Sequence, residues 1–332
     1  MLIEKIKTKL INFSQYLGNN AYLNPVDMRS RKYKKKLYIT TTAWGDYLEY
    51  YFNYSMPAAT NNSNLQALER EGFEINIILY TLNKDYVIKK YKSNLSVGSK
   101  QIEVRQIDSG NETEIRKIAF FPLLDILKKC LDEDAFFFNL TPDMIIGNSS
   151  LFNCVMSSYG KNTCFASAHP RVSLNILDEL EKKSNKGFEN SDLVALSFKF
   201  PHDNFKFANE DLENNTTHKG ISYRKISPTL YSITHNLPSP GLIFPIEGDY
   251  EYFNRARDYN MIDREWMQTL IKTNRIKVSG SSDLFFNIEL TPASFIASEE
   301  IKDNAKYNDS AGDEFYHRVC RTFTSVWRQK NA

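Results

Sequence analysis

Short apolar runs rich in β-branched residues alternate with amphipathic segments along most of the chain. Leu37–Thr42 and Ile75–Thr81 have the pattern of buried strands, and the tyrosine-rich stretch between them repeats its rings at helical spacing. Ala135–Leu140 and Thr163–Ala168 are further apolar runs of strand length, with a helical period between them. A repeated strand–helix–strand order builds a parallel sheet covered by helices. The pattern therefore predicts an α/β fold, with a Rossmann-like mixed, mostly parallel sheet flanked by helices.

The two ends of the chain have patterns of their own. Residues 2–17 place apolar side chains near helical spacing with lysines mostly opposite, which predicts an N-terminal amphipathic helix. A basic run over 29–36 follows it, and a closing helix is expected at about 313–329. Residues 1–36 are expected to form an N-terminal helix and basic segment that packs on the domain, pairs with another chain or lies on an anionic membrane. Residues 37–332 are expected to form a single α/β catalytic-type domain, with a polar insertion near 202–228.

Composition narrows the class of protein. The net charge of +2 over 332 residues gives no global field for nucleic acid, so we expect no nucleic-acid partner. None of the four cysteines forms a C-x-x-C pair, which argues against a zinc site. The N-terminus lacks the continuous apolar core of a signal peptide, and no apolar run is long enough to span a membrane. We therefore expect a cytoplasmic protein, with peripheral contact to the inner membrane open through residues 1–36.

Polar side chains follow several of the apolar runs. Trp44-Gly45-Asp46 comes first, where the glycine would let the backbone approach a phosphate and Asp46 could instead cap the next helix. Asp143 follows 135–140 and could hold a sugar hydroxyl or a metal, or bond local amides in a turn. His169 could act as a base and Arg171 could grip a phosphate, although each could equally be structural. Because parallel strands end at one edge of a sheet, these residues predict a site for an anionic, hydroxyl-rich ligand.

An acid-x-acid pair follows the apolar run Leu242–Ile246. Glu247 and Asp249 are the carboxylates that a divalent ion bridging a diphosphate would need, with a surface turn as the alternative. His235 lies shortly before this run and could project into the same cleft. The Asp-x-Asp at 132–134 precedes its strand and is expected to end a helix. The pair Glu247 and Asp249 is therefore the predicted site for Mg²⁺ or Mn²⁺.

These residues give the chain a resemblance to bacterial glycosyltransferase-like proteins of surface-polysaccharide clusters. The resemblance covers most of 37–330 and implies a nucleotide-sugar transferase fold of the GT-A-like type. Where the group has an acid-rich segment after Pro142-Asp143, this chain has Asn148, which the resemblance places among the substrate-binding residues. The motifs that carry the resemblance are Trp44-Gly45, Tyr47, Phe52, Pro57, Asn64-Leu65, Leu68, the strand at 78–81, Pro142-Asp143, Ser149-Ser150-Leu151, Arg171-Val172, Asp192-Leu193-Val194, His202, Glu247–Asp249 and Ser282-Asp283.

The leading hypothesis is a glycosyltransferase that moves a sugar from a nucleotide-sugar donor to a glycan or lipid-linked acceptor. The nucleotide would lie over the ends of the strands at 37–42 and 75–81, and Arg171 and a metal would stabilise the leaving diphosphate. One alternative is a non-catalytic carbohydrate-binding or assembly protein that stacks aromatic rings on sugars, and another is a membrane-peripheral scaffold using residues 1–36. The expected catalytic residues are Asp143 and Asp249, and the expected substrate-binding residues are Trp44, Gly45, Asp46, Asn148, His169, Arg171 and His235.

Overall fold

The computed structural model describes most of the chain between residues 31 and 329. The described residues are 31–108, 110, 118–182, 187–206, 208–209, 221–235, 239–256, 263–292 and 323–329. The predicted N-terminal helix at 2–17 and the middle of the predicted insertion, 210–220, lie outside these residues.

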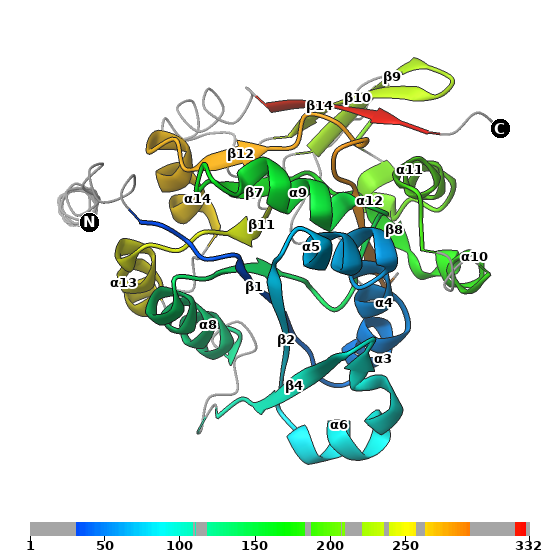
Figure 1. The fold of residues 1–332 in the computed structure, drawn as a ribbon. Coiled ribbons are helices and arrows are strands. Elements are labelled where there is room, and N and C mark those ends of the chain that lie inside the picture. The colour runs from blue at the N-terminus through cyan, green and yellow to red at the C-terminus, as the bar shows by residue number, and fades with distance from the viewer. Residues whose placement is uncertain are drawn as a thin grey trace, which may run out of the picture.

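An eight-stranded sheet forms the centre of the fold (Figure 1). β1, β2, β4 and β5 run parallel to one another, and β12 is parallel to β7. β11 is antiparallel to both of its neighbours, and β3 is antiparallel to β4. The prediction of a mixed, mostly parallel sheet flanked by helices is confirmed. In spatial order the strands are β12 (Ile276–Val278), β7 (Cys164–Ser167), β11 (Ser239–Ile243), β5 (Phe136–Asn139), β1 (Lys36–Thr42), β2 (Glu74–Thr81), β4 (Lys100–Gln106) and β3 (Ser96–Val97).

Helices cover both faces of this sheet and make two apolar cores. Side chains alternate between the faces along each strand, so Leu37 and Ile39 join one core while Tyr38 joins the other. The second core lies under α8 and α14, and the first lies under the helices that follow β1 and under α9 (Figure 1). The described helices are α3 (Tyr47–Tyr50), η1 (Tyr51–Ser55), α4 (Met56–Ala59), η2 (Asn62–Gln66), α5 (Ala67–Arg70), α6 (Lys84–Lys90), η3 (Lys92–Asn94), α8 (Phe120–Glu133), α9 (Ser150–Ser158), η4 (Leu174–Ile176), α10 (Leu177–Glu181), α11 (Asn190–Lys199), α12 (Asp203–Lys206), α13 (Glu247–Ala256) and α14 (Asp263–Lys272).

The helix after β1 contains a π-helical turn. It runs through α3, η1 and α4 without interruption and ends at Ala59. Pro57 therefore stands inside the helix, in the first turn of α4, where its missing N–H follows directly on the wider π-helical turn. Asp46 occupies the N-cap position, but its side chain accepts no capping hydrogen bond. The alternative role of Asp46 as a helix cap is thus not seen.

Two three-stranded sheets complete the described fold. One is β14 (Phe323–Arg328), β10 (Leu230–His235) and β9 (Ile221–Ser227), and the other is β6 (Met144–Ile146), β13 (Asn287–Thr291) and β8 (Arg171–Ser173). The closing helix expected at 313–329 is wrong over its last turns, because Phe323–Arg328 is a strand that pairs antiparallel with β10. The strand expected at 242–246 is displaced toward the N-terminus, and Glu247 already begins α13.

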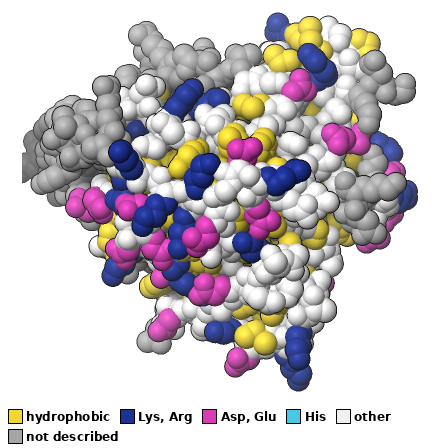
Figure 2. Space-filling model, viewed as in Figure 1, with side chains coloured by type: hydrophobic (Ala, Val, Ile, Leu, Met, Phe, Trp, Pro, Cys, Tyr) yellow, Lys and Arg dark blue, Asp and Glu magenta, His cyan; other side chains and the backbone are white. Residues whose placement is uncertain are grey.

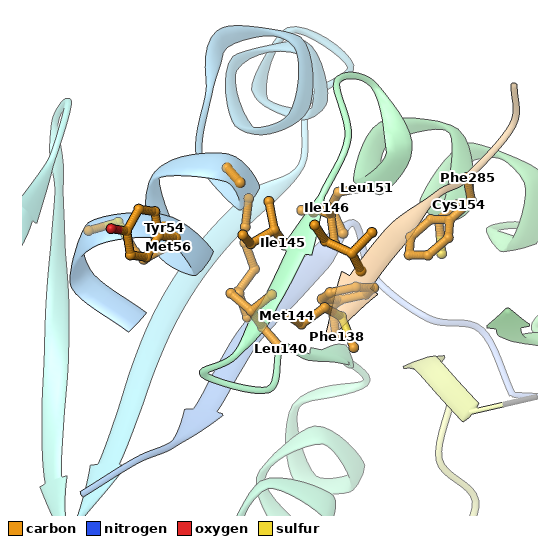
Figure 3. Close-up of a cluster of buried hydrophobic side chains, with 14 of the residues drawn as sticks. Tyr54, Met56, Phe138, Leu140, Met144, Ile145, Ile146, Leu151, Cys154 and Phe285 are labelled. Atoms are coloured by element: carbon orange, nitrogen blue, oxygen red, sulfur yellow. The ribbon is translucent and has the colours of Figure 1, made fainter. Parts of the chain in front are cut away.

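β6 is buried between helices on both of its sides. Figure 3 shows Met144, Ile145 and Ile146 packed between the helix carrying Tyr54 and Met56 and the helix α9. All three side chains of β6 are almost completely buried. This packing holds the turn that immediately precedes β6, which carries Asp143.

The described part of the basic run makes ion pairs within the chain. Arg31 lies 3.2 Å from Asp134 and 3.1 Å from Glu247, and Lys36 lies 2.8 Å from Glu133. Basic and acidic side chains are interspersed over the face shown in Figure 2. Arg31 and Lys36 are therefore paired with acids of the same chain, and the face in Figure 2 is not purely basic. No helix among the described residues is both long enough and apolar enough to cross a membrane.

Candidate functional site

A polar cavity of about 250 Å³ lies beyond the carboxyl ends of β5 and β7. The small sheet β6–β13–β8 closes one side of it, and β11 contributes a glycine from another side. This is the edge at which ligands bind in open α/β sheets. The residues that line the cavity are Phe138, Asn139, Thr141, Asp143, Met144, Ser167, His169, Gly241, Phe285, Asn287 and Glu289.

The turn that carries Asp143 is held by hydrogen bonds from three parts of the chain. The backbone N–H of Met144 donates to the carbonyl of Thr141 at 3.1 Å, and the N–H of Leu290 donates to the carbonyl of Asp143 at 2.9 Å. The hydroxyl of Ser55, in the π-helical turn, donates to the same Thr141 carbonyl at 3.0 Å. The backbone of the turn that carries Asp143 is therefore held by β13 and by the helix after β1.

Glu289 lies at the centre of a charged group beside Asp143. Arg171 is its neighbour across the β8–β13 pair, and the Nε of Arg171 donates to Oε1 of Glu289 at 2.9 Å. Nε2 of His169 lies 2.9 Å from Oε2 of the same carboxylate. Only 5% of the Arg171 side chain is exposed, so Arg171 braces Glu289 and does not line the cavity. The predicted grip of Arg171 on a phosphate has no support in this geometry.

The contact with Glu289 also orients the ring of His169. A carboxylate only accepts hydrogen bonds, so Nε2 of His169 must carry the proton in the neutral ring, and Nδ1 is then the acceptor. Nδ1 is buried and makes no hydrogen bond among the described residues. His169 lines the cavity, but its Nδ1 atom has almost no exposed surface in this structure.

Asp143 is the side chain in this cavity with the most useful acid–base chemistry. Burial, and after it the negative charge of Glu289, raises the pKa of Asp143 from 3.8 to about 6, while Thr141 and His169 act in the opposite direction. A carboxyl with this pKa is mostly ionised at neutral pH but still accepts a proton readily. Such a carboxyl is chemically suited to act as a general base, and the catalytic role of Asp143 stays a prediction.

Two tyrosines of α3 lie close to these charges. The Tyr47 hydroxyl is within electrostatic range of Asp143, Glu289 and Arg171, and Tyr50 is within range of Asp143. The rings of Tyr47 and Tyr50 meet edge to face, with centroids 6.1 Å apart. Tyr47 is 43% exposed, so much of its ring is available to a ligand.

The predicted segment Trp44-Gly45-Asp46 leads directly into these tyrosines. The Ala43 N–H donates to the carbonyl of Tyr80 at 2.9 Å, which keeps this loop against the end of β2. Gly45 has a φ of 58°, a left-handed conformation that favours glycine, and no atom lies close to where a side chain would start. Trp44 is half-buried against the second core. The structure therefore brings the ends of β1, β5 and β7 to one edge, as the order of the strands predicted.

Ser167 and Asn287 form a polar part of the cavity wall. The Ser167 hydroxyl donates to Oδ1 of Asn287 at 3.1 Å, which fixes the orientation of that amide. Asn139, at the end of β5, is exposed and also lines the cavity. These amides and hydroxyls suit a ligand with many hydroxyl groups.

Asn148 lies in a different polar cluster. Its Oδ1 accepts from Nδ2 of Asn61 at 2.9 Å, and its own Nδ2 donates to Glu189 at 2.7 Å. It does not line the cavity. These contacts join η2 to the start of α11, so the structure favours a structural role for Asn148 over the predicted contact with substrate.

Glu247 and Asp249 also lie outside the cavity, in the first turn of α13. Asp249 is 1% exposed, and its two carboxylate oxygens accept from Arg275 at 2.9 and 2.6 Å. The Asp249 carboxylate also accepts hydrogen bonds from the indole of Trp266 and from the backbone N–H of Ile246. The bond to Ile246 is that of a capping box, in which an acid in the first turn accepts from the N–H of the residue before its helix. Glu247 points to solvent and pairs with Arg31.

This arrangement is at odds with the predicted metal pair. A divalent ion needs oxygen lone pairs that are not already used by a guanidinium and an indole. In the described part of the chain no three His, Cys, Asp or Glu side chains gather as a group that could hold a metal ion. Asp249 is therefore better explained as a buried structural anion than as a catalytic or metal-binding residue.

His235 ends β10, in the sheet formed with β9 and β14. Its side chain is outside the described residues, so its predicted role stays a prediction.

Asn139, Thr141, Ser167, Asn287 and Glu289 are polar residues of the cavity that the sequence pattern did not single out. Ser282-Asp283, a motif of the resemblance, does not line the cavity, because Ser282 is buried and Asp283 is an exposed partner of Arg328. A signal was present in β13 itself, where polar Asn287 and Glu289 alternate with apolar residues. Alternation of this kind places both polar side chains on one face of the strand.

Comparisons with known proteins give no family for the chain. No family model matches it, and no curated protein matches it. Among solved structures, 4-diphosphocytidyl-2C-methyl-D-erythritol synthase from Anaerococcus prevotii is similar over 85% of this chain and 98% of that one, with 13% identity and a TM-score of 0.39. The inositol-1-phosphate CTP transferase from T. maritima is similar over 84% and 98%, with 11% identity and a TM-score of 0.35.

A third structure, HddC from Yersinia pseudotuberculosis, matches 41% of this chain and 59% of its own length, with 16% identity and a TM-score of 0.24. These scores are low, and the three likenesses assign no activity to this chain. What stands on the chain's own structure is an α/β fold with a polar, acidic cavity at the carboxyl edge of its mostly parallel sheet.

Proposed function

We propose that this protein is a glycosyltransferase that moves a sugar from a nucleotide-sugar donor to a hydroxyl of a glycan or lipid-linked acceptor. The observation that carries the proposal is Asp143, a carboxyl with a pKa of about 6 that lines a small polar cavity at the carboxyl edge of the sheet. A base of this strength can take the proton of an alcohol as its oxygen attacks a carbon.

In the proposed reaction the acceptor oxygen forms a bond to the anomeric carbon of the donor sugar as the bond to the donor phosphate breaks. Asp143 takes the acceptor proton, and the nucleoside diphosphate leaves with the bonding electrons. The negative charges of Asp143 and Glu289 also favour the positive charge that develops on the sugar ring. Glu289 would act from a position that His169 and Arg171 hold.

The nucleotide would lie outside the cavity, over the ends of β1 and β2. The loop 43–46 follows β1 there, with left-handed Gly45 open to an approaching phosphate and Trp44 beside it. A divalent ion is not a premise of the proposal, because Asp249 is engaged by Arg275. Dependence on Mg²⁺ or Mn²⁺ is a separate question that the same assay answers.

Incubating the purified protein with uridine-, guanosine- and cytidine-linked sugars, with and without Mg²⁺ or Mn²⁺, tests the proposal. We expect binding of at least one donor by calorimetry and slow release of its nucleotide, with Asp143→Asn reducing turnover by about 100-fold or more. Asp283→Asn is the matched control, since Asp283 is an exposed acid outside the cavity, and it should keep full turnover. If no donor is bound or hydrolysed, the proposal is overturned.

The exposed ring of Tyr47 favours a second candidate function, which is carbohydrate binding without transfer. An aromatic ring beside polar side chains is sufficient to bind a sugar. In that case the protein would bind glycans, no donor would be consumed, and Asp143→Asn would leave the activity in cells unchanged. The donor assay therefore separates the two candidates.

A further inference from the structure

The cavity is small and carries more negative charge than positive on its walls. Its volume of about 250 Å³ is slightly below the roughly 300–1,000 Å³ that is usual for sites that enclose a drug-sized ligand. Two of its lining residues, Asp143 and Glu289, are acids, and they are close enough that Glu289 raises the pKa of Asp143. The space fits one sugar ring, and the charge disfavours a phosphate or a carboxylate inside it.

Titratable side chains from β13, α3 and the segment before β8 surround Asp143. Glu289 faces it from β13, His169 from the segment before β8, and Tyr47 and Tyr50 from α3. Arg171 of β8 compensates Glu289 through its Nε, which leaves Asp143 as the acid whose charge has no arginine partner at hydrogen-bonding distance among the described residues. An anionic ligand would have to approach this charge.

The uncharged polar groups of the cavity favour a hydroxyl-rich ligand. Asn139 and Asn287 supply amides, and Ser167 and Thr141 supply hydroxyls. Side chains of these types can donate to and accept from the alternating hydroxyls of a sugar.

Tyr47 is not one of the residues that line the cavity, but its hydroxyl lies within electrostatic range of Asp143 and Glu289, which do line it, and its ring offers an apolar surface. It is 43% exposed and braced edge to face by Tyr50, so it is held in one orientation without being covered. One face of a pyranose ring presents C–H groups, which pack well on an aromatic ring. The other, more polar edges of the sugar would then point to the cavity.

We infer that the cavity binds a single neutral pyranose of the acceptor glycan, stacked on Tyr47 and hydrogen-bonded by the amides and hydroxyls, and that it rejects uronic acids. The inference deepens the proposed function and rests on it for the part that this sugar plays as acceptor. The binding itself needs no nucleotide. Specificity against uronic acids comes from Asp143, whose negative charge would face the carboxylate of the sugar.

Titration of the full-length protein with methyl glycosides, followed by saturation-transfer NMR, tests the inference without any donor. The probes are the methyl glycosides of glucose, galactose and N-acetylglucosamine, compared with those of glucuronic and galacturonic acid. At about pH 8 we expect at least one neutral glycoside to bind about tenfold or more tightly than its uronate. At about pH 5 the difference should shrink, because protonation of Asp143 makes the cavity less negative.

Variants of the tyrosines sharpen the test. Tyr47→Ala should weaken binding of the neutral glycoside by about tenfold or more, whereas Tyr47→Phe, which keeps the ring, should bind nearly as well as the wild type. Tyr86→Ala is the matched control, because Tyr86 is similarly exposed at 45% but lies on α6, where its neighbour is Lys90 and not the acids of the cavity. Asp143→Asn should bring the binding of uronates close to that of neutral glycosides.

The inference is overturned if no glycoside binds, if uronates bind as tightly as neutral glycosides at about pH 8, or if Tyr47→Ala binds like the wild type. Its failure is distinct from failure of the proposed function. A protein that binds neutral glycosides but consumes no donor keeps this inference and loses the proposed reaction. A protein that consumes a donor but binds no glycoside loses only the inference.

Discussion

Asp143 is a carboxyl that the fold places in a cavity wall next to a second carboxylate. Its pKa is raised from 3.8 to about 6, so the folded state binds a proton more readily than the unfolded chain does. Protonated Asp143 therefore stabilises the fold relative to its ionised form. That stabilisation is fully present below about pH 4 and is lost as the pH rises through about 6.

Asp143→Asn should consequently make the protein more stable at neutral pH while it removes the proposed base. We expect an increase of about 1–3 kcal/mol in the free energy of unfolding near neutral pH, fading toward about pH 4. Urea unfolding of both proteins at several pH values measures this. A variant that is equally stable or less stable at neutral pH would contradict the assigned environment of Asp143.

Glu289 and Glu103 each pair with an arginine, but at different depths. The Arg171–Glu289 pair joins side chains that are 5% and 17% exposed, whereas Glu103 in the Arg105 pair is 53% exposed. Glu289→Gln should cost about 3 kcal/mol or more, because it disrupts a largely buried charged group, whereas Glu103→Gln should cost less than about 1 kcal/mol. Chemical unfolding of the two variants compares them directly.

Glu289→Gln has a second consequence that a merely structural residue would not have. Removing its negative charge should lower the pKa of Asp143, because Glu289 is one of the causes of the raised value. The acid limb of the pH profile of turnover should then move to lower pH. An unmoved acid limb would show that Glu289 does not act on Asp143.

At the scale of elements, α13 is attached to the sheet by one buried anion. Asp249 bonds to the start of its own helix, to Trp266 of α14 and to Arg275 before β12. Asp249→Asn should destabilise the protein by about 3 kcal/mol or more, since it leaves the 5% exposed Arg275 guanidinium without its charged partner. Glu247→Gln, two residues earlier and 75% exposed, should cost less than about 1 kcal/mol.

Thermal unfolding of these two variants checks the assignment, and a metal titration adds to it. If a divalent ion bound between Glu247 and Asp249, either substitution would lower the stability of the protein in the presence of the metal. Equal losses for Glu247→Gln and Asp249→Asn, appearing only with Mg²⁺ or Mn²⁺, would restore the pair as a metal site.

Asn64 joins three helical elements through one buried amide. Its Nδ2 donates to the carbonyls of Ala58 and Gly147, and its Oδ1 accepts from the N–H of Leu151. Asn64→Ala should cost about 2–3 kcal/mol, because it leaves buried backbone groups without partners. Asn76→Ala is the control, since among the described residues the Asn76 side chain bonds only to the exposed Glu74, and its variant should unfold in urea like the wild type.

At the scale of the whole molecule, the basic segment is balanced by acids from distant parts of the chain. Arg31 reaches Asp134 and Glu247, and Lys36 reaches Glu74 and Glu133. Replacing Arg31 and Lys36 together by glutamine should lower stability by about 1–2 kcal/mol and leave sedimentation with anionic lipid vesicles as in the wild type. A loss of vesicle binding without a loss of stability would instead show that these two charges face a membrane.

Much of the sheet was predictable because its strands are local patterns. The runs at 37–42, 75–81, 135–140 and 163–168 became β1, β2, β5 and β7 within two residues at each end. Buried parallel strands are apolar on both faces, so each one stands out in its own segment of sequence. Phe323–Arg328 was assigned to a helix, since an amphipathic edge strand takes its hydrogen bonds from β10, which is far away in the chain.

For the site, the sequence by itself determined that polar residues follow strands at one edge of a sheet. That is enough to bring together Asp143, His169 and Arg171, because β5 and β7 run in the same direction, each antiparallel to β11 between them, and end on the same side. Only the tertiary structure decided what each residue does there. Glu289 lies 118 residues after Arg171 in the sequence, on β13, and accepts a hydrogen bond from the Arg171 guanidinium. Arg171 therefore holds Glu289 in place instead of facing a phosphate. The Asp249 carboxylate is paired with the guanidinium of Arg275, which lies 26 residues later in the sequence. Charge pairing over such separations depends on how the elements pack, and no local pattern in the sequence encodes it.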